Sequence, residues 1–357
     1  TQPQGKLDVG GTIFADQLNV SGVSTFVGIL TATNIFADRY HGDENNNFYA
    51  GPFVGSSSTE STLNIGIGQS SGTSLTTGKN NILLGNCVGA ALTTGEHNIF
   101  LGIGAGKQSP ASNDVLIGKC SGCSLTSSGG NVVIGCLAYW QKENGGGQNI
   151  AIGGQAGRGN PDNYFSNISL GFQAGSHSSP ANHNISIGYR AANFTSGNST
   201  CGTNDGNIFL GCKSGSNAGY GVSIASNVIM GVGAGSGIRK GPFGTISENV
   251  YIGKCAGSGY CGSCNIFIGS KAGDTDSLSP NPIGDSNIAI GQNVLVPNQL
   301  GSNQLAIGQT SQYWITGDQY FNVGIGITDP STAVLRADKT QKLAAGIVTA
   351  YNLFGEG

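Results

Sequence analysis

The chain has 357 residues, of which 62 are Gly and only 10% are charged, whereas average proteins contain roughly 7% Gly and roughly 25% charged residues, so an ordinary helical domain is excluded. Disorder is excluded as well, because 38% of the residues are apolar and they recur periodically. The net charge of −3, without runs of Lys or Arg, gives no electrostatic footprint for binding nucleic acid or an anionic membrane.

The first segment, residues 1–60, is predicted to be a strand-rich module. Residues 28–36 read GILTATNIF and are echoed near the other end by residues 346–354, which read GIVTAYNLF. Six identities in nine aligned positions indicate that one type of module occurs twice. We therefore expect a second strand-rich module over 327–357 and a distinct central region over 61–326.

The central region repeats a pentapeptide of Asn, aliphatic, any residue, aliphatic and Gly, in most cases every 16 to 18 residues. Asp114 and Gln304 replace the leading Asn in two copies. The other thirteen copies, which bring the total to fifteen, begin at Asn64, Asn81, Asn98, Asn131, Asn149, Asn167, Asn184, Asn207, Asn227, Asn249, Asn265, Asn287 and Asn322.

A period this short cannot hold a helix pair or a propeller blade, which need about 33 residues or more. It predicts an all-β, elongated β-solenoid or β-roll of about 15 coils with 16 to 23 residues each, in which every coil supplies two short strands. Strand side chains alternate between faces. We therefore expect positions two and four of the pentapeptide to point inward and position three to point outward or toward another subunit.

Other positions of the repeat predict the structure of the remainder of each coil. Gly at position five marks a corner. A small residue follows two to three positions later, which indicates a narrow core; examples are Ala105, Ala156, Ala174, Ala234, Ala256 and Ala272. A Leu eleven positions after the leading residue is predicted to be the inward residue of the second strand; examples are Leu75, Leu92 and Leu125.

The leading Asn could be a sugar or metal ligand, but its repetition favours a structural role. Asn side chains stacked about 4.8 Å apart form hydrogen-bonded ladders. Asn167 and Asn184 also match the N-glycosylation pattern, and we discount them because both belong to this ladder. The Gly-rich stretch at 102–106 is weak as a dinucleotide motif, because no amphipathic helix or acidic residue follows at the required distance. No cofactor is predicted.

Nine Cys is an odd number, so complete pairing within the chain is impossible. Two CxxC spacings, 120–123 and 261–264, are compatible with a zinc site or a redox pair. Neither spacing is followed by paired His, and no βαβ pattern surrounds it. The favoured interpretation is small, half-buried filler residues or loop thiols, and no metal site is predicted.

Two aromatic pairs, Tyr139-Trp140 and Tyr313-Trp314, contain the only Trp residues of the chain. On a polar rod they could stack on sugar rings of a receptor or anchor the packing of subunits, and the sequence leaves both alternatives open. Apolar residues at position three predict an exposed stripe, and such stripes mark interfaces. Self-association, most simply as a trimer, would bury the stripe and protect the sheet edges.

Several segments resemble known fibre proteins. Residues 322–330, NVGIGITDP, resemble the NVGIGTTxP motif that is common in bacteriophage tail fibres, and 24–33, STFVGILTAT, resemble structural proteins of marine cyanobacterial phages. The repeat from Thr93 onward is similar to the β-roll heads of trimeric autotransporter adhesins. The resemblance implies a homotrimeric virion appendage that contacts the host surface. The variable repeat length departs from the adhesin pattern.

The expected function is therefore a structural subunit of a viral fibre or tail appendage that takes part in host attachment. Its expected partners are copies of itself, other virion proteins and a host-surface receptor such as a glycan, without nucleic acid or membrane insertion. The alternative is a bacterial surface adhesin or extracellular filament subunit. An enzyme is not expected, because a polysaccharide depolymerase needs paired carboxylates in one groove and the 19 acidic residues cluster only loosely.

Overall fold

The structure is a computed structural model, and it describes residues 45–126, 129–140, 146–159, 165–176, 182–193, 205–216, 222–237, 244–275, 284–310, 312–328, 330 and 343–345. All of these residues belong to one compact unit, His41–Gly357. Most of the two predicted terminal modules, 1–60 and 327–357, lies outside the described residues.

The described chain is dominated by one 18-stranded sheet, to which nearly every coil contributes a strand of three residues. Its strands are β1 (Phe48–Ala50), β2 (Ile65–Ile67), β3 (Ile82–Leu84), β4 (Ile99–Leu101), β5 (Val115–Ile117), β6 (Val132–Ile134), β7 (Ile150–Ile152), β8 (Ile168–Leu170), β9 (Ile185–Ile187), β10 (Ile208–Leu210), β12 (Val228–Met230), β14 (Val250–Ile252), β15 (Ile266–Ile268), β16 (Ile288–Ile290), β17 (Leu305–Gln309), β18 (Gln312–Gly317), β19 (Val323–Ile325) and β20 (Leu343–Ala345). Two further strands, β11 (Val222–Ala225) and β13 (Gly244–Ser247), pair with each other in a separate sheet.

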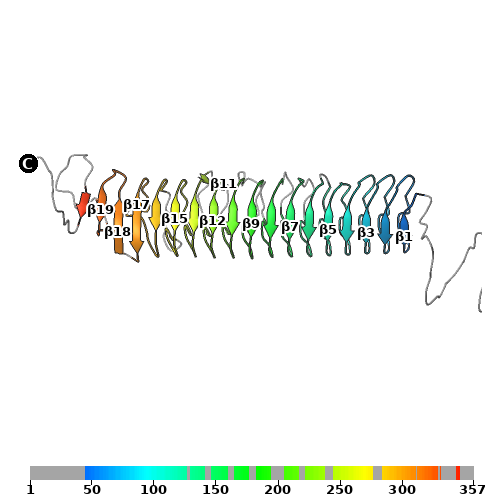
Figure 1. The fold of residues 1–357 in the computed structure, drawn as a ribbon, viewed down its shortest axis with the longest axis horizontal. Coiled ribbons are helices and arrows are strands. Elements are labelled where there is room, and N and C mark those ends of the chain that lie inside the picture. The colour runs from blue at the N-terminus through cyan, green and yellow to red at the C-terminus, as the bar shows by residue number, and fades with distance from the viewer. Residues whose placement is uncertain are drawn as a thin grey trace, which may run out of the picture. The chain divides into compact units, whose positions relative to one another are not determined.

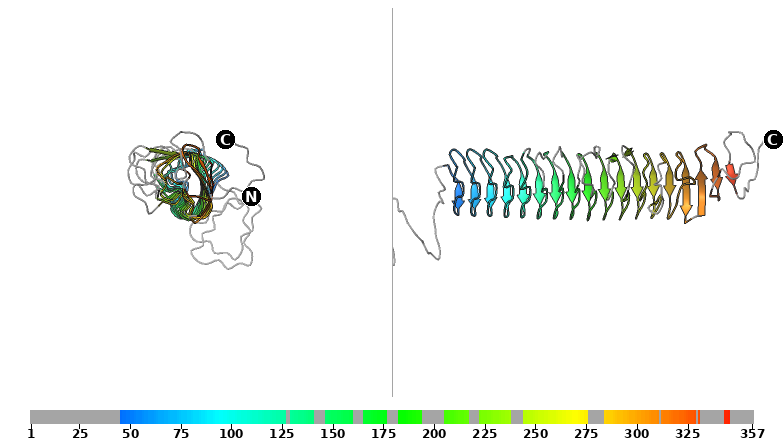
Figure 2. Two further views of the ribbon diagram at one scale, coloured as in Figure 1. Left: turned by 90° about the vertical axis from the view of Figure 1, so that its left-hand side faces the viewer. Right: turned by 180° about the vertical axis from the view of Figure 1, so that it is seen from behind.

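The strands from β1 to β17 stack in parallel and in register. In each step the three residues of one strand face the equivalent three of the next, as Ile82–Leu84 face Ile99–Leu101. Figure 1 shows the strands side by side in one row, and the view along that row in Figure 2 shows the coils superimposed. The predicted all-β, elongated solenoid is confirmed, and the described residues contain no α-helix.

The stack begins one coil earlier than the repeats predict and ends differently. Asn47 precedes β1 as the other leading residues precede their strands, although aromatic residues stand at positions two and three of this copy. At the other end, β18 pairs antiparallel with both β17 and β19. The last copy of the pentapeptide, at Asn322, is therefore separated from the parallel stack by a reversed strand.

The predicted direction of the strand side chains is wrong. Position three is the buried position in every coil from β2 to β17, whereas positions two and four are half-buried or exposed. Leu83, for example, is fully buried between Ile82 and Leu84, which both remain partly accessible. The side chains alternate between the two faces as predicted, but each of positions two, three and four lies on the face opposite to the predicted one.

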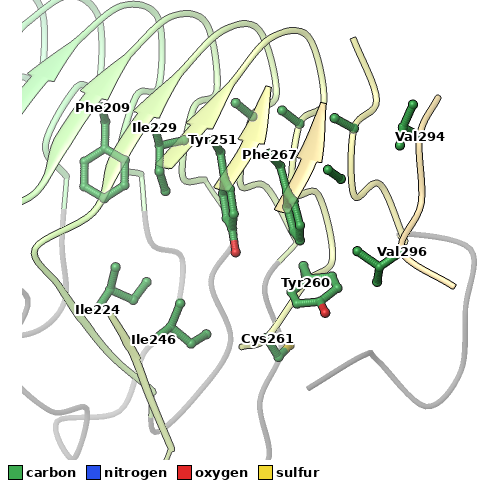
Figure 3. Close-up of a cluster of buried hydrophobic side chains, with 14 of the residues drawn as sticks. Phe209, Ile224, Ile229, Ile246, Tyr251, Tyr260, Cys261, Phe267, Val294 and Val296 are labelled. Carbon is green, nitrogen blue, oxygen red and sulfur yellow. The ribbon is translucent and has the colours of Figure 1, made fainter. Parts of the chain in front are cut away.

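The buried position-three residues form the core together with side chains from the return side of each coil. Figure 3 shows Phe209, Ile229, Tyr251 and Phe267, which come from successive strands and project toward the same interior. The rings of Tyr251 and Phe267 are stacked, with centroids 5.2 Å apart and planes 6° apart. The predicted inward Leu and Ala residues of the return side are confirmed as fully buried; they are Leu75, Leu92, Leu125, Ala105, Ala156, Ala174, Ala234, Ala256 and Ala272.

A second strand in every coil was predicted, and this is wrong for the described residues. Only β11 and β13 pair as strands on the return side. Elsewhere this side is irregular, because residues such as Cys87 and Gln155 adopt positive φ values that interrupt extended backbone. Hydrogen bonds between neighbouring coils are nevertheless retained, for example from Tyr139 N–H to the Ala156 carbonyl at 2.8 Å.

The corner at position five needs Gly for two reasons. Gly102 has φ of +117°, and a Cβ placed there would lie 2.8 Å from the carbonyl carbon of Gly118 in the next coil. The positive φ would strain any residue other than Gly, and the close approach means that a side chain would push neighbouring coils apart. The predicted corner is therefore confirmed, and close contact between coils adds to the conformational requirement.

Leu83→Ala is expected to destabilise the fold by about 2–5 kcal/mol, the cost of deleting a buried Leu side chain. The matched control is Ile103→Ala, because Ile103 lies at a corner with 60% of its side chain exposed, and it should change the stability by less than about 0.5 kcal/mol. Denaturant unfolding followed by circular dichroism compares the two. Equal losses would contradict the assignment of position three to the core.

Candidate functional site

The leading Asn residues form a continuous ladder through the interior. Both the backbone N–H and the side-chain Nδ2 of Asn81 donate to Oδ1 of Asn64, each at 2.9 Å. Asn98 repeats this arrangement on Asn81 at 3.0 Å. Such bonds run from Asn64, which donates to Asn47, to Gln304, which donates to Asn287. The predicted structural role of these residues is confirmed over this range.

Many Asn rungs also tie the two sides of their own coil together. Asn81 Nδ2 donates to the carbonyl of Gly95 at 2.9 Å, fourteen residues further along the same coil. The ladder side chains are buried, so their amide groups need partners inside the protein. With its Oδ1 and Nδ2 used in this way, the ladder residue has no capacity to bind a sugar or a metal ion.

Asn322, which was predicted as the last rung, lies outside this ladder. Its backbone N–H and Nδ2 donate to the carboxylate of Asp318 at 3.0 and 2.7 Å. The reversed strand β18 stands between its coil and that of Gln304. The pentapeptide pattern therefore persists beyond the point where parallel stacking ends.

Asp114 is the one acidic rung. Its Oδ1 accepts hydrogen bonds from the backbone N–H and Nδ2 of Asn131 at 2.8 and 3.0 Å. Ser109 Oγ donates to Oδ2 at 3.5 Å. Burial raises the pKa of the Asp114 carboxyl to about 6, although the bonds from Asn131 and Ser109 act in the opposite direction. The ladder thus contains one group that titrates near neutral pH.

The outward positions two and four create the most extensive surface feature, which we call the aliphatic face. It consists of two parallel columns on the outer side of the sheet, and nearly every member is Ile, Leu or Val. Within the parallel stack each of these side chains lies between its equivalents in the neighbouring coils, which reduces its accessibility to solvent. Even so, about 40% of Ile67 and of Ile152 is exposed. The face extends along all the coils of the parallel stack and is not centred on any one residue.

The exposed apolar stripe is predicted at position three of the pentapeptide, and the structure places it at positions two and four. Positions two and four are more uniform than position three. A buried column can vary in residue size where the opposite side of the coil compensates, so the variation at position three is compatible with burial.

The pair Tyr139-Trp140, predicted to contact a receptor or a second subunit, is divided between core and surface. Tyr139 is fully buried, and Asn149 Nδ2 donates to its hydroxyl at 2.8 Å. Burial raises the pKa of this hydroxyl well above its usual range. Trp140 is half-buried, and the Arg158 guanidinium lies 4.9 Å from the centre of its ring. Only Trp140 is placed to meet another molecule.

The second pair, Tyr313-Trp314, lies on the reversed strand β18. Tyr313 is partly buried against the core, whereas 65% of Trp314 is exposed. The two Trp residues belong to coils at distant positions of the stack, β6 and β18. They therefore do not form one site.

The cysteines of the described chain form neither a disulfide nor a metal-binding cluster. The eight described Cys residues are free thiols, and most are buried or half-buried. Burial is the main cause that raises the pKa of Cys123, with Cys120 nearby as a further cause. No group of three His, Cys, Asp or Glu in the described ranges could hold a metal ion. Likewise, these ranges include no helix long and apolar enough to span a membrane.

Comparison of the chain with models of protein families, with characterised proteins and with solved structures found no match.

Asp114→Asn is expected to raise the thermal stability at pH 7 and to change it little at pH 4. An Asp in the unfolded chain has a pKa near 3.9, below the folded value of about 6. Between these values the unfolded state loses its proton first, so stability falls by about 1.4 kcal/mol per pH unit as pH rises, and the loss persists above pH 6. Asn removes this loss and restores an Nδ2 donor.

Melting curves recorded by circular dichroism from pH 4 to pH 8 test this expectation. The matched variant is Asn81→Asp, which places an acidic rung between two Asn rungs and should acquire the pH-dependent loss that Asp114→Asn removes. A gain in Asp114→Asn of the same size at pH 4 and pH 7 would show that the carboxyl does not titrate in this range.

Proposed function

We propose that the chain is a structural subunit of a viral fibre or tail appendage, which self-associates through the aliphatic face and takes part in attachment to the host surface. The observation that carries the proposal is a parallel sheet with one face covered by its own chain and the other lined by Ile, Leu and Val. Parallel sheets are normally buried on both faces. The uncovered face therefore requires a partner.

The geometry of the face selects the kind of partner. Its side chains recur with every coil, at the strand spacing of about 4.8 Å, from β1 to β17. A partner that covers this face must present apolar side chains with the same spacing over the same length. A second copy of the chain does so by construction, which is the usual origin of symmetric homo-oligomers.

Three copies suit the width of the face. A strand of three residues is only about 10 Å wide, and each coil offers two outward aliphatic side chains to cover. Three such narrow sheets can meet around a common axis and enclose one apolar centre, with the return sides of the coils facing solvent. This arrangement agrees with the trimer that the fibre resemblance implies.

The role in a virion follows from the resemblance together with the fold. An unbranched stack of coils is long and stiff, which suits a mechanical role. We infer that the protein acts mechanically and in recognition, without catalysis; release of soluble sugar from a polysaccharide by the pure protein would oppose this. The alternative is a bacterial surface adhesin or filament subunit, for which the repeats are equally suitable. Decoration of purified virions by an antibody raised against this protein separates the two.

The native mass tests self-association directly. Sedimentation equilibrium at micromolar concentration should give three times the chain mass of 36.1 kDa. Replacing Ile150, Ile152, Ile168 and Leu170 by Lys puts charges on the face in two successive coils and should weaken association at least tenfold, because unpaired charges are costly to bury. The control is Ile103→Lys, at an exposed corner outside the face, which should remain associated. A monomeric wild-type protein would refute the proposal.

A further inference from the structure

A compact group of exposed rings and cations lies on the corners of four successive coils, those of β6 to β9. We call it the aromatic–arginine patch and define it by Phe172, Tyr189, Arg190, Gln173, Gln155 and Arg158, with Trp140 at its edge. Phe172 and Tyr189 occupy the same repeat position, directly after the corner Gly, in adjacent coils. Their exposed fractions are 43% and 45%, so neither ring serves the core.

The two rings form one offset stack. Their centroids are 5.8 Å apart and their planes differ by 12°, a geometry that leaves part of each ring face uncovered. Gly154 occupies the preceding position of the same column, and a Cβ there would lie 3.3 Å from Cδ2 of Phe172. The absence of a side chain at 154 therefore gives the Phe172 ring its place at the surface.

A ladder of polar side chains runs beside the rings. Gln173 Nε2 donates to Gln155 Oε1 at 2.9 Å, and Arg190 Nε donates to Gln173 Oε1 at 2.8 Å. Arg158 Nη1 donates to Gln155 Oε1 at 3.4 Å. The Arg190 guanidinium also lies 5.3 Å from the centre of the Tyr189 ring. These contacts orient the side chains before any ligand arrives, which lowers the entropic cost of binding.

The patch is electropositive although the chain is acidic overall. Arg158 and Arg190 lie in it. The acidic residue among the described residues of its four coils, Asp205, lies two positions before the next ladder residue and accepts a hydrogen bond from the backbone N–H of Asn182 at 2.8 Å. The net charge of the whole chain is −3. With Nε of Arg190 engaged by Gln173, the guanidinium retains four N–H groups on its terminal nitrogens, which match the geometry of a carboxylate.

The patch is distinct from the surface proposed for self-association. Other coils carry Lys119, Cys136, Lys254 or Ser270 at the position of Phe172 and Tyr189. This column is therefore not uniformly apolar, unlike the aliphatic face. The coils of β8 and β9 are also exceptional inside, because Ser169 and Ser186 stand at the buried position three and separate the two apolar clusters of the core. In these two coils the aromatic side chains lie on the surface, and the buried position three holds a small polar side chain.

We propose that the aromatic–arginine patch binds an acidic polysaccharide, one sugar carboxylate being held by Arg190 while the C–H face of the ring packs on Phe172 and Tyr189. Sugar rings combine an apolar face with polar edges, and this matches aromatic faces that are bordered by amide and guanidinium donors. The inference rests on the proposed attachment function and names the ligand class for it.

Isothermal titration of the full chain with polygalacturonate at 0.15 M salt tests the proposal. Saturable binding is expected, and Tyr189→Ala and Arg190→Ala should each weaken it at least tenfold. Lys213→Ala is the matched control, because Lys213 is the cation at the same corner position one coil further along, and it should bind like the wild type. The methyl ester of polygalacturonate, which lacks the charge, should bind at least tenfold more weakly.

Three outcomes would overturn the proposal: no binding, equal binding by Tyr189→Ala, or equal binding of poly-glutamate, which carries carboxylates without sugar rings. Sedimentation of the same samples separates this site from self-association. An associated wild type that does not bind refutes the site alone, whereas a monomeric wild type that binds refutes the fibre assembly alone. Loss of association in Tyr189→Ala would instead assign the patch to a subunit contact.

Discussion

The buried Asn ladder is the interaction on which the rest of the structure depends. Each rung from Asn64 to Gln304 donates its backbone N–H to the side chain of the preceding rung, and most Asn rungs add their side-chain amide, as Asn81 does on Asn64. A slip of one residue would leave these buried groups without partners, at a cost of about 1–3 kcal/mol for each group. The register of every strand is thereby fixed, although the coils differ in length and return path.

Fixed register explains why a single chain presents a surface as regular as the aliphatic face. The coils differ in length, but each strand of the parallel stack starts at the same place next to its ladder residue. Equivalent side chains of successive strands therefore stay aligned over the whole parallel stack. An aliphatic residue at position two or four consequently lies next to its equivalents in the neighbouring coils. The interior polar ladder and the outer apolar columns are two consequences of the same periodicity.

The sequence predicted the solenoid, the ladder and the Gly corners, because each depends on local spacing. It predicted the wrong direction for the strand side chains, since alternation alone does not say which face of a strand the rest of the coil covers. Variation at position three suggested exposure, yet the core compensates for it. Ala151 is small where the large Tyr139 ring enters from the return side, and a Cβ at Gly157 would approach both. Such exchange between distant residues is invisible to a column-by-column reading.

The same reasoning explains why the aromatic–arginine patch could not be found from sequence. Phe172 and Tyr189 are seventeen residues apart, and they become neighbours only once the coils are stacked in register. The Trp-containing pairs attracted attention because Trp is rare, but Tyr139 is needed inside. A residue type at one position carries little information about recognition in a solenoid. What matters is whether successive coils place complementary groups in adjacent columns, and among the described coils those of β8 and β9 combine stacked rings with a cation in this way.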